Sequence, residues 1–274
     1  MMADLMQISY SDLDAYHQCA RRYYYEKRLR MGTLPELATT AVKRGVLMHT
    51  LLEGARDGVL DEAQASALFA REQVTDLREQ EVLRRAVRLV LGSAAYTEVT
   101  AGAAVRRERQ FFLALRDPAS SGSVRFLKGY IDIQGTRPDG SLLILDYKSG
   151  TRAEAQASDY EDQARCYALV GLADGHPSVE VRFIRPEVVG EDSRLCVGGD
   201  TLGAPPVPAQ QEPAPQVFVL GSYAPGDYAD IEANLISAIH DMERTGPDSS
   251  MATDAFACQG CPVPRVACPQ AKHG

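Results

Sequence analysis

A strand–turn–strand segment constrains the fold more than any other part of this sequence. Residues 124–134 and 141–148 are rich in apolar and β-branched side chains, which predicts two strands. Between them, Pro138 fixes its own φ and Gly140 accepts a positive φ, so the connection is predicted to be a tight turn. The segment is therefore expected to form an antiparallel hairpin.

Two carboxylates and a lysine converge on this hairpin. The turn places Asp132 opposite Asp146 or its immediate neighbour, and Lys148 shares the face of Asp146 because the two residues are two apart. Like charges directly opposed on a sheet are destabilising. A divalent cation removes that cost, since Mg²⁺ prefers carboxylate oxygens, waters and phosphate oxygens as ligands. The alternative is a surface hairpin with a salt bridge among the three side chains, and the hairpin alone leaves both interpretations open.

Helices and further strands are expected around the hairpin. Ser11 and Asp14 have the spacing of a capping box, which predicts that a helix starts there. Helical composition or spacing recurs at residues 11–25, 45–53, 61–90, 159–172 and 227–244. Strand-like runs occur at residues 110–115, 179–184 and 216–220. A helical crossover from one strand to the next allows the two to be parallel. These elements predict an α/β fold with a mixed central sheet flanked by helices and an N-terminal helical region.

Bulk properties limit the class of protein. The chain has 274 residues and a net charge of -8, which argues against coating nucleic acid by bulk positive charge. No apolar run approaches the roughly 20 residues of a membrane span, and residues 1–5 do not begin a signal peptide. We therefore expect a cytoplasmic protein that does not contact membranes. A P-loop motif is absent from the sequence, so any ATP-driven motor would be a partner.

Three of the six cysteines crowd the C-terminus. Cys258, Cys261 and Cys268 form a C-x2-C-x6-C array that lacks a fourth ligand. In a cytosolic chain such an array favours metal binding over disulfides. Zinc and an iron–sulfur cluster both accept four thiolates, and the spacing does not choose between them. Cysteines in a disordered tail are the remaining alternative.

The ordered set of motifs resembles the RecB/AddB-like branch of the PD-(D/E)XK nuclease superfamily. The resemblance covers most of the chain except about residues 54–100 and 186–225, and each motif is weak by itself. The matching stretches are residues 8–19, 44–53, 108–111, 129–132, 146–150 and 160–167. It implies a restriction-endonuclease-like core and a metal-dependent nuclease.

The resemblance also implies roles for individual residues. His49, Asp132, Asp146 and the backbone carbonyl of Tyr147 would bind Mg²⁺ or Mn²⁺. The residues expected to serve catalysis are Asp132, Asp146, Lys148, Gln163, Tyr167 and, as a further carboxylate, Glu108. Gln163 and Tyr167 are four apart on one helical face.

In AddB-like nucleases one N-terminal cysteine joins three C-terminal ones around a [4Fe–4S] cluster. Cys19 occupies the matching position, so the resemblance implies a structural staple made of Cys19, Cys258, Cys261 and Cys268, with zinc as the less favoured occupant. Ala20 stands where the family often has proline, and the last gap is six residues where five is common. Cys166 and Cys196 are interpreted as buried or free thiols.

We expect one nuclease domain over residues 1–274. Its parts would be a helical insertion (54–100), a catalytic core (104–184), a Pro/Gly-rich irregular insertion (186–215) and a C-terminal helix with the cysteine cluster (226–274). The expected activity is exonucleolytic cleavage or DNA-end processing, with single-stranded ends favoured and a helicase or other repair or defence proteins as partners. The tyrosine-rich first helix could offer stacking surfaces or belong to the core. Two alternatives are a non-catalytic DNA-binding or structural subunit of a helicase–nuclease complex and a zinc-binding structural protein.

Overall fold

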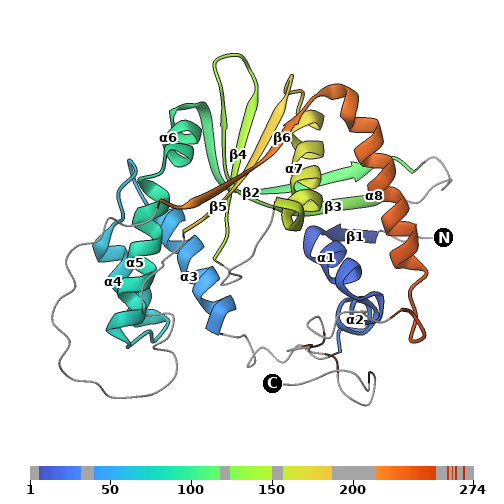
Figure 1. The fold of residues 1–274 in the computed structure, drawn as a ribbon, viewed down its shortest axis with the longest axis horizontal. Coiled ribbons are helices and arrows are strands. Elements are labelled where there is room, and N and C mark those ends of the chain that lie inside the picture. The colour runs from blue at the N-terminus through green and yellow to red at the C-terminus, as the bar shows by residue number, and fades with distance from the viewer. Residues whose placement is uncertain are drawn as a thin grey trace.

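The computed structural model describes most of the chain. The described residues are 6–31, 40–117, 124–149, 157–186 and 214–250, with Cys258, Cys261, Val263 and Cys268. A six-stranded mixed sheet lies between two groups of helices (Figure 1). This is the predicted α/β class, and it agrees with a restriction-endonuclease-like core.

The strands run in the order β1-β3-β4-β5-β6, and β2 pairs with β3 beside this path. Their bounds are β1 Met6–Ser9, β2 Ala103–Leu115, β3 Arg125–Thr136, β4 Leu142–Tyr147, β5 Val179–Arg185 and β6 Gln216–Tyr223. β3 is antiparallel to β2 and β4, as predicted for three successive strands. β4 and β5 are parallel, which confirms the helical crossover between them.

The helices form two groups, one on each side of the sheet (Figure 1). One group contains α1 Tyr10–Gln18, α2 Ala20–Tyr23, α7 Glu161–Ala173 and α8 Tyr228–Glu243. The other contains α3 Thr40–Gly54, α4 Glu62–Arg71, α5 Leu77–Leu91 and α6 Ala94–Ala101. Shorter turns are the π-helical η1 Tyr24–Arg28 and the 3₁₀ turns η3 Ala157–Tyr160 and η5 Pro225–Asp227.

Each group of helices packs its own core onto the sheet. The core with α1, α7 and α8 includes Ile131, Ile144 and Leu169, none of which is exposed. The core with α3 to α6 includes Ile133 and Leu145, also fully buried. Successive residues of β4 therefore enter different cores, which is why this strand is apolar along its whole length. Burying each such side chain contributes about 1.5–3 kcal/mol.

A gap beside β3 positions the candidate site. β1 pairs with β3 at residues 125–128, and β4 pairs with it at residues 133–136. Both strands lie on the side of β3 away from β2, so residues 129–132 have no strand partner there. Backbone groups in such a gap find their partners among side chains or water.

Several predicted boundaries were wrong. α1 begins at Tyr10 because Ser9 and Asp12 form the capping box, two residues before the predicted Ser11 and Asp14. Asp12 Oδ2 accepts from the backbone nitrogen of Ser9 over 2.8 Å. The strand predicted at 110–115 begins at Ala103. Its first half is polar and largely exposed, so the sequence there lacks the apolar pattern of a strand. β1 was not predicted, because four residues carry too little pattern.

Other predictions concern residues that lie partly or wholly outside the described part of the chain. Of the predicted irregular insertion at 186–215, only residues 186, 214 and 215 are described, and Cys196 and Gly150 lie outside the described residues. The helix predicted at 227–244 is α8, and its spaced isoleucines and leucine are buried. Within the described residues, no helix is long and apolar enough to cross a membrane.

Candidate active site

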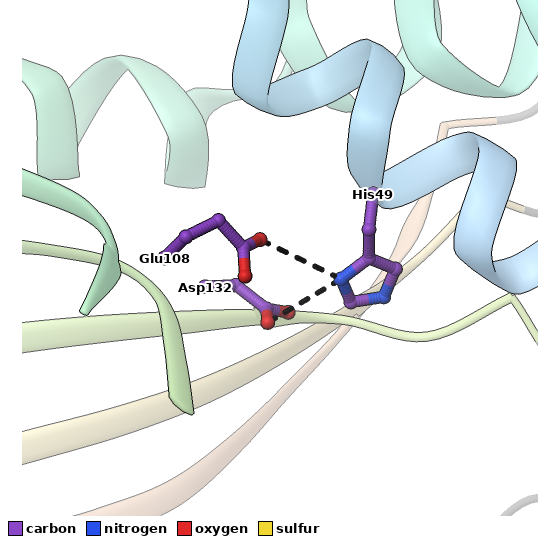
Figure 2. A group of neighbouring side chains, drawn as sticks. All are labelled: His49, Glu108 and Asp132. Atoms are coloured by element: carbon purple, nitrogen blue, oxygen red, sulfur yellow. Dashed lines mark ion pairs between the residues drawn. The ribbon is translucent and has the colours of Figure 1, made fainter. Parts of the chain in front are cut away.

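Three side chains that could bind a metal ion meet beside β3, and we call them the metal-ligating group (Figure 2). His49 comes from α3, Glu108 from β2 and Asp132 from β3, and one ligand atom of each lies within 4.8 Å of the others. Nδ1 of His49 is 3.4 Å from Asp132 Oδ1 and 3.9 Å from Glu108 Oε1. Within the described residues this is the one group of three such side chains at that spacing.

Glu108 joins the group through an unusual backbone conformation. Its φ is +45°, in the left-handed region that a residue with a side chain rarely adopts. Strained residues of this kind cluster at functional sites, where the surrounding structure holds them. Glu108 also lies between Arg107 and Arg109, which pair with Ile133 and Ile131 of β3. The strain therefore occurs at the level of Asp132.

Tyr147 ties His49 and Asp132 together through its backbone. Its nitrogen donates to Asp132 Oδ2 over 2.7 Å, in the place of a strand-to-strand hydrogen bond. Its carbonyl oxygen lies 3.0 Å from Nε2 of His49. Since a carbonyl only accepts, Nε2 carries a hydrogen, and Nδ1 is the nitrogen that faces the carboxylates. The carbonyl predicted as a metal ligand is therefore at the site and hydrogen-bonded to the predicted histidine.

The charged side chains at the site shift the pKa values of His49 and Asp132. Burial disfavours the charged imidazole of His49, but hydrogen bonds with Asp132 and Glu108 outweigh burial and raise its pKa to about 10. Burial, followed by the charge of Asp146, raises the pKa of Asp132 to about 6. Two buried carboxylates thus repel one another at this end of the hairpin, as the opposed positions predicted.

Asp146 heads a second polar group on the α7 side of the site. Gln163 Nε2 donates to Asp146 Oδ2 over 2.9 Å, and the Tyr167 hydroxyl lies 2.8 Å from the same oxygen. Gln163 Oε1 accepts from Lys148 Nζ over 2.7 Å. The Tyr167 hydroxyl is also 2.9 Å from the carbonyl of Tyr130, which lies in the gap of β3. The Q-x-x-x-Y helix therefore reaches the hairpin with both predicted side chains.

The other oxygen of Asp146 is buried without a hydrogen-bond partner. Lys148 Nζ lies 2.5 Å from this Oδ1 as an ion pair, but not in the direction of a hydrogen bond. An under-satisfied buried carboxylate oxygen is costly and suits a cation. His49, Glu108 and Asp132 offer hard oxygen donors and one imidazole, a set that fits a divalent metal, and Asp146 is not among the side chains of that group.

Two aromatic rings beside Lys148 were not among the predicted site residues. Nζ lies 5.0 Å from the ring centroid of Phe183 on β5 and 5.6 Å from that of Tyr160 in η3. The two rings stack on each other with centroids 4.8 Å apart. Phe183 pairs with Asp146 where β4 and β5 run parallel. Aligning these two strands from the sequence would therefore have placed Phe183 at the site.

The described cysteines are free thiols. Cys261 and Cys268 are buried with Val263, and Tyr25 packs against them. Burial raises the pKa of the Cys261 thiol, and the charges of Cys19 and Cys268 raise it further. Arg21 holds the same region, since its backbone nitrogen donates to Ser250 O over 3.2 Å. The cysteine region is thus beside α2, apart from the metal-ligating group.

The tyrosine run predicted for the first helix lies at the end of α2 and in η1, and its side chains differ in burial. Tyr23 is buried in the core with α7 and α8, whereas Tyr24 and Tyr25 are half-buried. Cys166 on α7 is buried in the same core, as expected of a packed thiol. Much of the tyrosine run therefore belongs to packing.

Comparison with known proteins supports one family. No curated protein matches the chain. Solved structures that resemble it include that of SSO0001, with 14% sequence identity, a TM-score of 0.46, and coverage of 100% of this chain and 91% of that one. This likeness is too distant to carry an argument. Residues 7–269 match the family model for the PD-(D/E)XK nuclease superfamily. The matched range includes the hairpin, α7 and the cysteine region. The chain therefore belongs to the PD-(D/E)XK nuclease superfamily.

Proposed function

We propose that this protein is a metal-dependent DNA nuclease that hydrolyses phosphodiester bonds at the hairpin of β3 and β4. The observation that carries the proposal is the burial of two carboxylates at one end of this hairpin. Asp132 is 6% exposed and Asp146 is 2% exposed. A salt-bridged surface hairpin, the simpler interpretation of the sequence, has no reason to bury them. Buried like charges are costly unless a cation or a reaction uses them.

The metal would be Mg²⁺ or Mn²⁺, held by His49, Asp132, Asp146 and the carbonyl of Tyr147, with Glu108 as a further carboxylate. The close spacing of His49, Glu108 and Asp132 and the burial of Asp132 and Asp146 support this assignment. Such a cation lowers the pKa of water and neutralises charge on phosphate oxygens. The imidazole of His49 must lose its proton at Nδ1 before that nitrogen can act as a ligand.

The protein's own catalytic groups would be Lys148, Gln163 and Tyr167. Lys148 carries the charge that can orient water or stabilise negative charge developing on the phosphate. Gln163 holds Lys148 and Asp146 at the same time, so it fixes their separation. Tyr167 orients Asp146, and its hydroxyl also lies 2.9 Å from the Tyr130 carbonyl in the gap of β3.

We further assign the chain to the RecB/AddB-like branch, with a [4Fe–4S] cluster on Cys19, Cys258, Cys261 and Cys268. The burial of Cys261 and Cys268 and the influence of Cys19 on the pKa of Cys261 support a shared site. Four thiolates also suit zinc. The cluster would be structural, since it lies beside α2 and away from the hairpin.

The proposed biological role is exonucleolytic or DNA-end processing in the cytoplasm by a single nuclease domain over residues 1–274. A helicase or another repair or defence protein would supply the DNA end. The negative net charge of -8 supports recognition at a local site over coating of long duplexes.

The test is a cleavage assay on three DNA substrates of one sequence, namely linear single strands, linear duplexes and covalently closed circles. Linear strands labelled at either end report polarity. We expect Mg²⁺ or Mn²⁺ to support cleavage of linear DNA and a chelator to abolish it. Cleavage of circles at an equal rate would overturn the exonuclease assignment, and binding without cleavage under all metals would favour the non-catalytic module.

A further inference from the structure

An exposed aromatic surface lies next to the metal-ligating group on the same pair of strands. Phe112 on β2 is 57% exposed and Tyr130 on β3 is 55% exposed. Both are large apolar side chains in regular strands, where one face is expected to be covered. A single exposed aromatic residue is ordinary, but two neighbouring ones at the edge of a polar site call for an occupant.

Strand register makes the two rings neighbours. Phe112 is opposite Lys128, and Gln110 is opposite Tyr130. Phe112 and Tyr130 are therefore diagonal partners on one face, at a separation of about 7–8 Å. We call these four residues the β2–β3 platform. Lys128 Nζ lies 3.1 Å from Gln7 Oε1 of β1, so its charge stays at the edge of the rings.

Core packing on the opposite face of β2 and β3 holds the platform residues on the exposed face. Phe111 is 6% exposed and lies against Gly129, where a Cβ atom would come within 2.8 Å of its ring. Leu127 and Ile131 are fully buried on that face. Because side chains alternate along a strand, Phe112 and Tyr130 are held pointing away from this core. Their exposure is thus built into the strands and is not a feature of a loop.

The platform continues directly into the candidate active site. Tyr130 is two residues before Asp132, and Gln110 is two residues after Glu108. Two residues of a strand span about 7 Å. Tyr130 also lies in the gap of β3, where its carbonyl oxygen accepts from Tyr167. A polymer bound at the metal-ligating group therefore reaches the two rings within the length of a few of its units.

We infer that the β2–β3 platform stacks unpaired bases of a single-stranded nucleic acid whose backbone is engaged at the hairpin. This inference rests on the proposed nuclease function and names the form of its substrate. Bases offer their flat faces to aromatic rings only when they are unpaired and unstacked, and such contacts are largely independent of sequence. With a net charge of -8, the chain gains affinity from stacking that bulk charge does not supply.

The absence of tryptophan from the sequence makes a direct test available. The Tyr130→Trp variant carries one indole, at the platform, and keeps a ring that can stack. In a chelating buffer that prevents cleavage, a single-stranded oligonucleotide is expected to quench its fluorescence. Val219→Trp is the matched control, since Val219 is 58% exposed on β6 and outside the platform. Equal quenching of both variants, or of neither while the strand binds, overturns the inference.

Affinity and salt dependence give a second measurement. Phe112→Ala and Tyr130→Ala should each raise the Kd for a single strand about tenfold. The slope of log Kd against log salt should stay unchanged, because neither ring contacts phosphate. Lys128→Gln should lower that slope by about 1. Val219→Ala should change neither quantity.

The outcomes separate this inference from the proposed function. Unchanged Kd values in both aromatic variants, with active cleavage by the wild type, overturn the platform and leave the nuclease intact. Stacking signals in a wild type that never cleaves DNA overturn the proposed function and support the platform. Self-association that disappears in Phe112→Ala, with unchanged strand affinity, assigns the surface to a second copy of the chain and overturns the inference.

Discussion

The side-chain amide nitrogen of Gln163 donates to Oδ2 of Asp146 over 2.9 Å. The amide oxygen of the same residue accepts from Lys148 over 2.7 Å. Gln163 is buried, so no water replaces these contacts without rearrangement. One glutamine therefore sets the position of both charged groups that the proposed reaction needs.

Replacing Gln163 by leucine should reduce kcat by about 10- to 100-fold, because residues that orient catalytic groups have effects of this size. KM for DNA should change less, since the amide is not exposed to bind substrate. Steady-state cleavage of an end-labelled strand measures both. Gln80→Leu is the control, because Gln80 bonds to Val74 O in the helical region. Equal kcat for the two variants would show that Gln163 has no positioning role.

Binding of Mn²⁺ should stabilise the folded chain. A ligand at about 100 times its Kd adds about 2.7 kcal/mol, which is a rise in Tm of about 5–10 °C for a protein of this size. Asp132→Asn should remove the shift, since it deletes a charged oxygen of the metal-ligating group. Differential scanning fluorimetry with and without metal gives the result. A full shift in Asp132→Asn would place the ion elsewhere.

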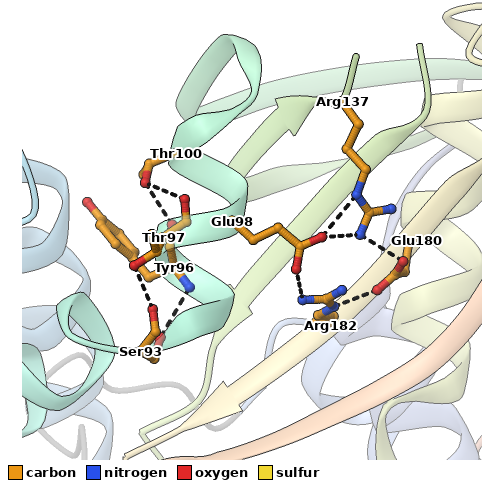
Figure 3. A network of polar contacts seen from close by, with 8 residues as sticks. All are labelled: Ser93, Tyr96, Thr97, Glu98, Thr100, Arg137, Glu180 and Arg182. Atoms are coloured by element: carbon orange, nitrogen blue, oxygen red, sulfur yellow. Dashed lines mark hydrogen bonds and ion pairs between the residues drawn. The ribbon is translucent and has the colours of Figure 1, made fainter. Parts of the chain in front are cut away.

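The ion pairs between α6 and the sheet should confer acid-sensitive stability (Figure 3). A hydrogen bond from Arg182, followed by one from Arg137, lowers the pKa of Glu98 despite burial. A carboxylate with a lowered folded pKa stabilises the protein above its unfolded pKa of 4.5, and this contribution is lost as pH falls through the folded pKa. The side chain is 42% exposed, so the contribution is about 1 kcal/mol or less.

Urea unfolding of the wild type and Glu98→Gln at several pH values measures this contribution. The wild type should be the more stable at pH 7, and the difference should shrink below pH 4.5 as the carboxylate is protonated. A difference that is constant across this range would mean that Glu98 acts through packing and not through charge.

The proposed [4Fe–4S] staple should be visible in the colour and stability of the protein. Cys261→Ser should give colourless protein of lower stability, since a link from residue 19 to residues 258–268 is worth roughly 5 kcal/mol in the chain-entropy model. Visible absorbance and bound iron are the measurements. Cys166→Ala should keep the colour, because that thiol is buried in the core with α1, α7 and α8. Bound zinc without colour in the wild type would contradict the cluster assignment.

Much of the hairpin formed by β3 and β4 could be predicted from the sequence. The turn residues and the alternation of apolar positions are local signals, so the pairing of β3 with β4 was correct, with Ile133 opposite Leu145. The histidine, the glutamine and Tyr167 were found through the family resemblance, and the structure brings all three to the hairpin. Local spacing alone gave no reason to bring α3 there.

The features that the sequence did not predict depend on contacts between distant segments of the chain. The parallel contact of β1 with β3 joins Met6 to Arg125 and leaves residues 129–132 of β3 without a strand partner on that side. No local pattern in the sequence encodes such a pairing, because register between distant strands is set by packing. The positive φ of Glu108 is likewise invisible in a sequence that has no glycine there. The aromatic neighbours of Lys148 also required the parallel register of β5.

In the proposed function, the buried Asp146 makes this hairpin a nuclease site. Single-turnover cleavage of a labelled single strand in Mg²⁺ tests it, with the wild type compared to Asp146→Asn. Asp57→Asn is the control, since Asp57 is exposed in the turn after α3. We predict that Asp146→Asn slows cleavage by at least about 100-fold while it folds normally, and that the control cleaves at the wild-type rate. Equal rates for the wild type and Asp146→Asn would contradict a nuclease site at this hairpin.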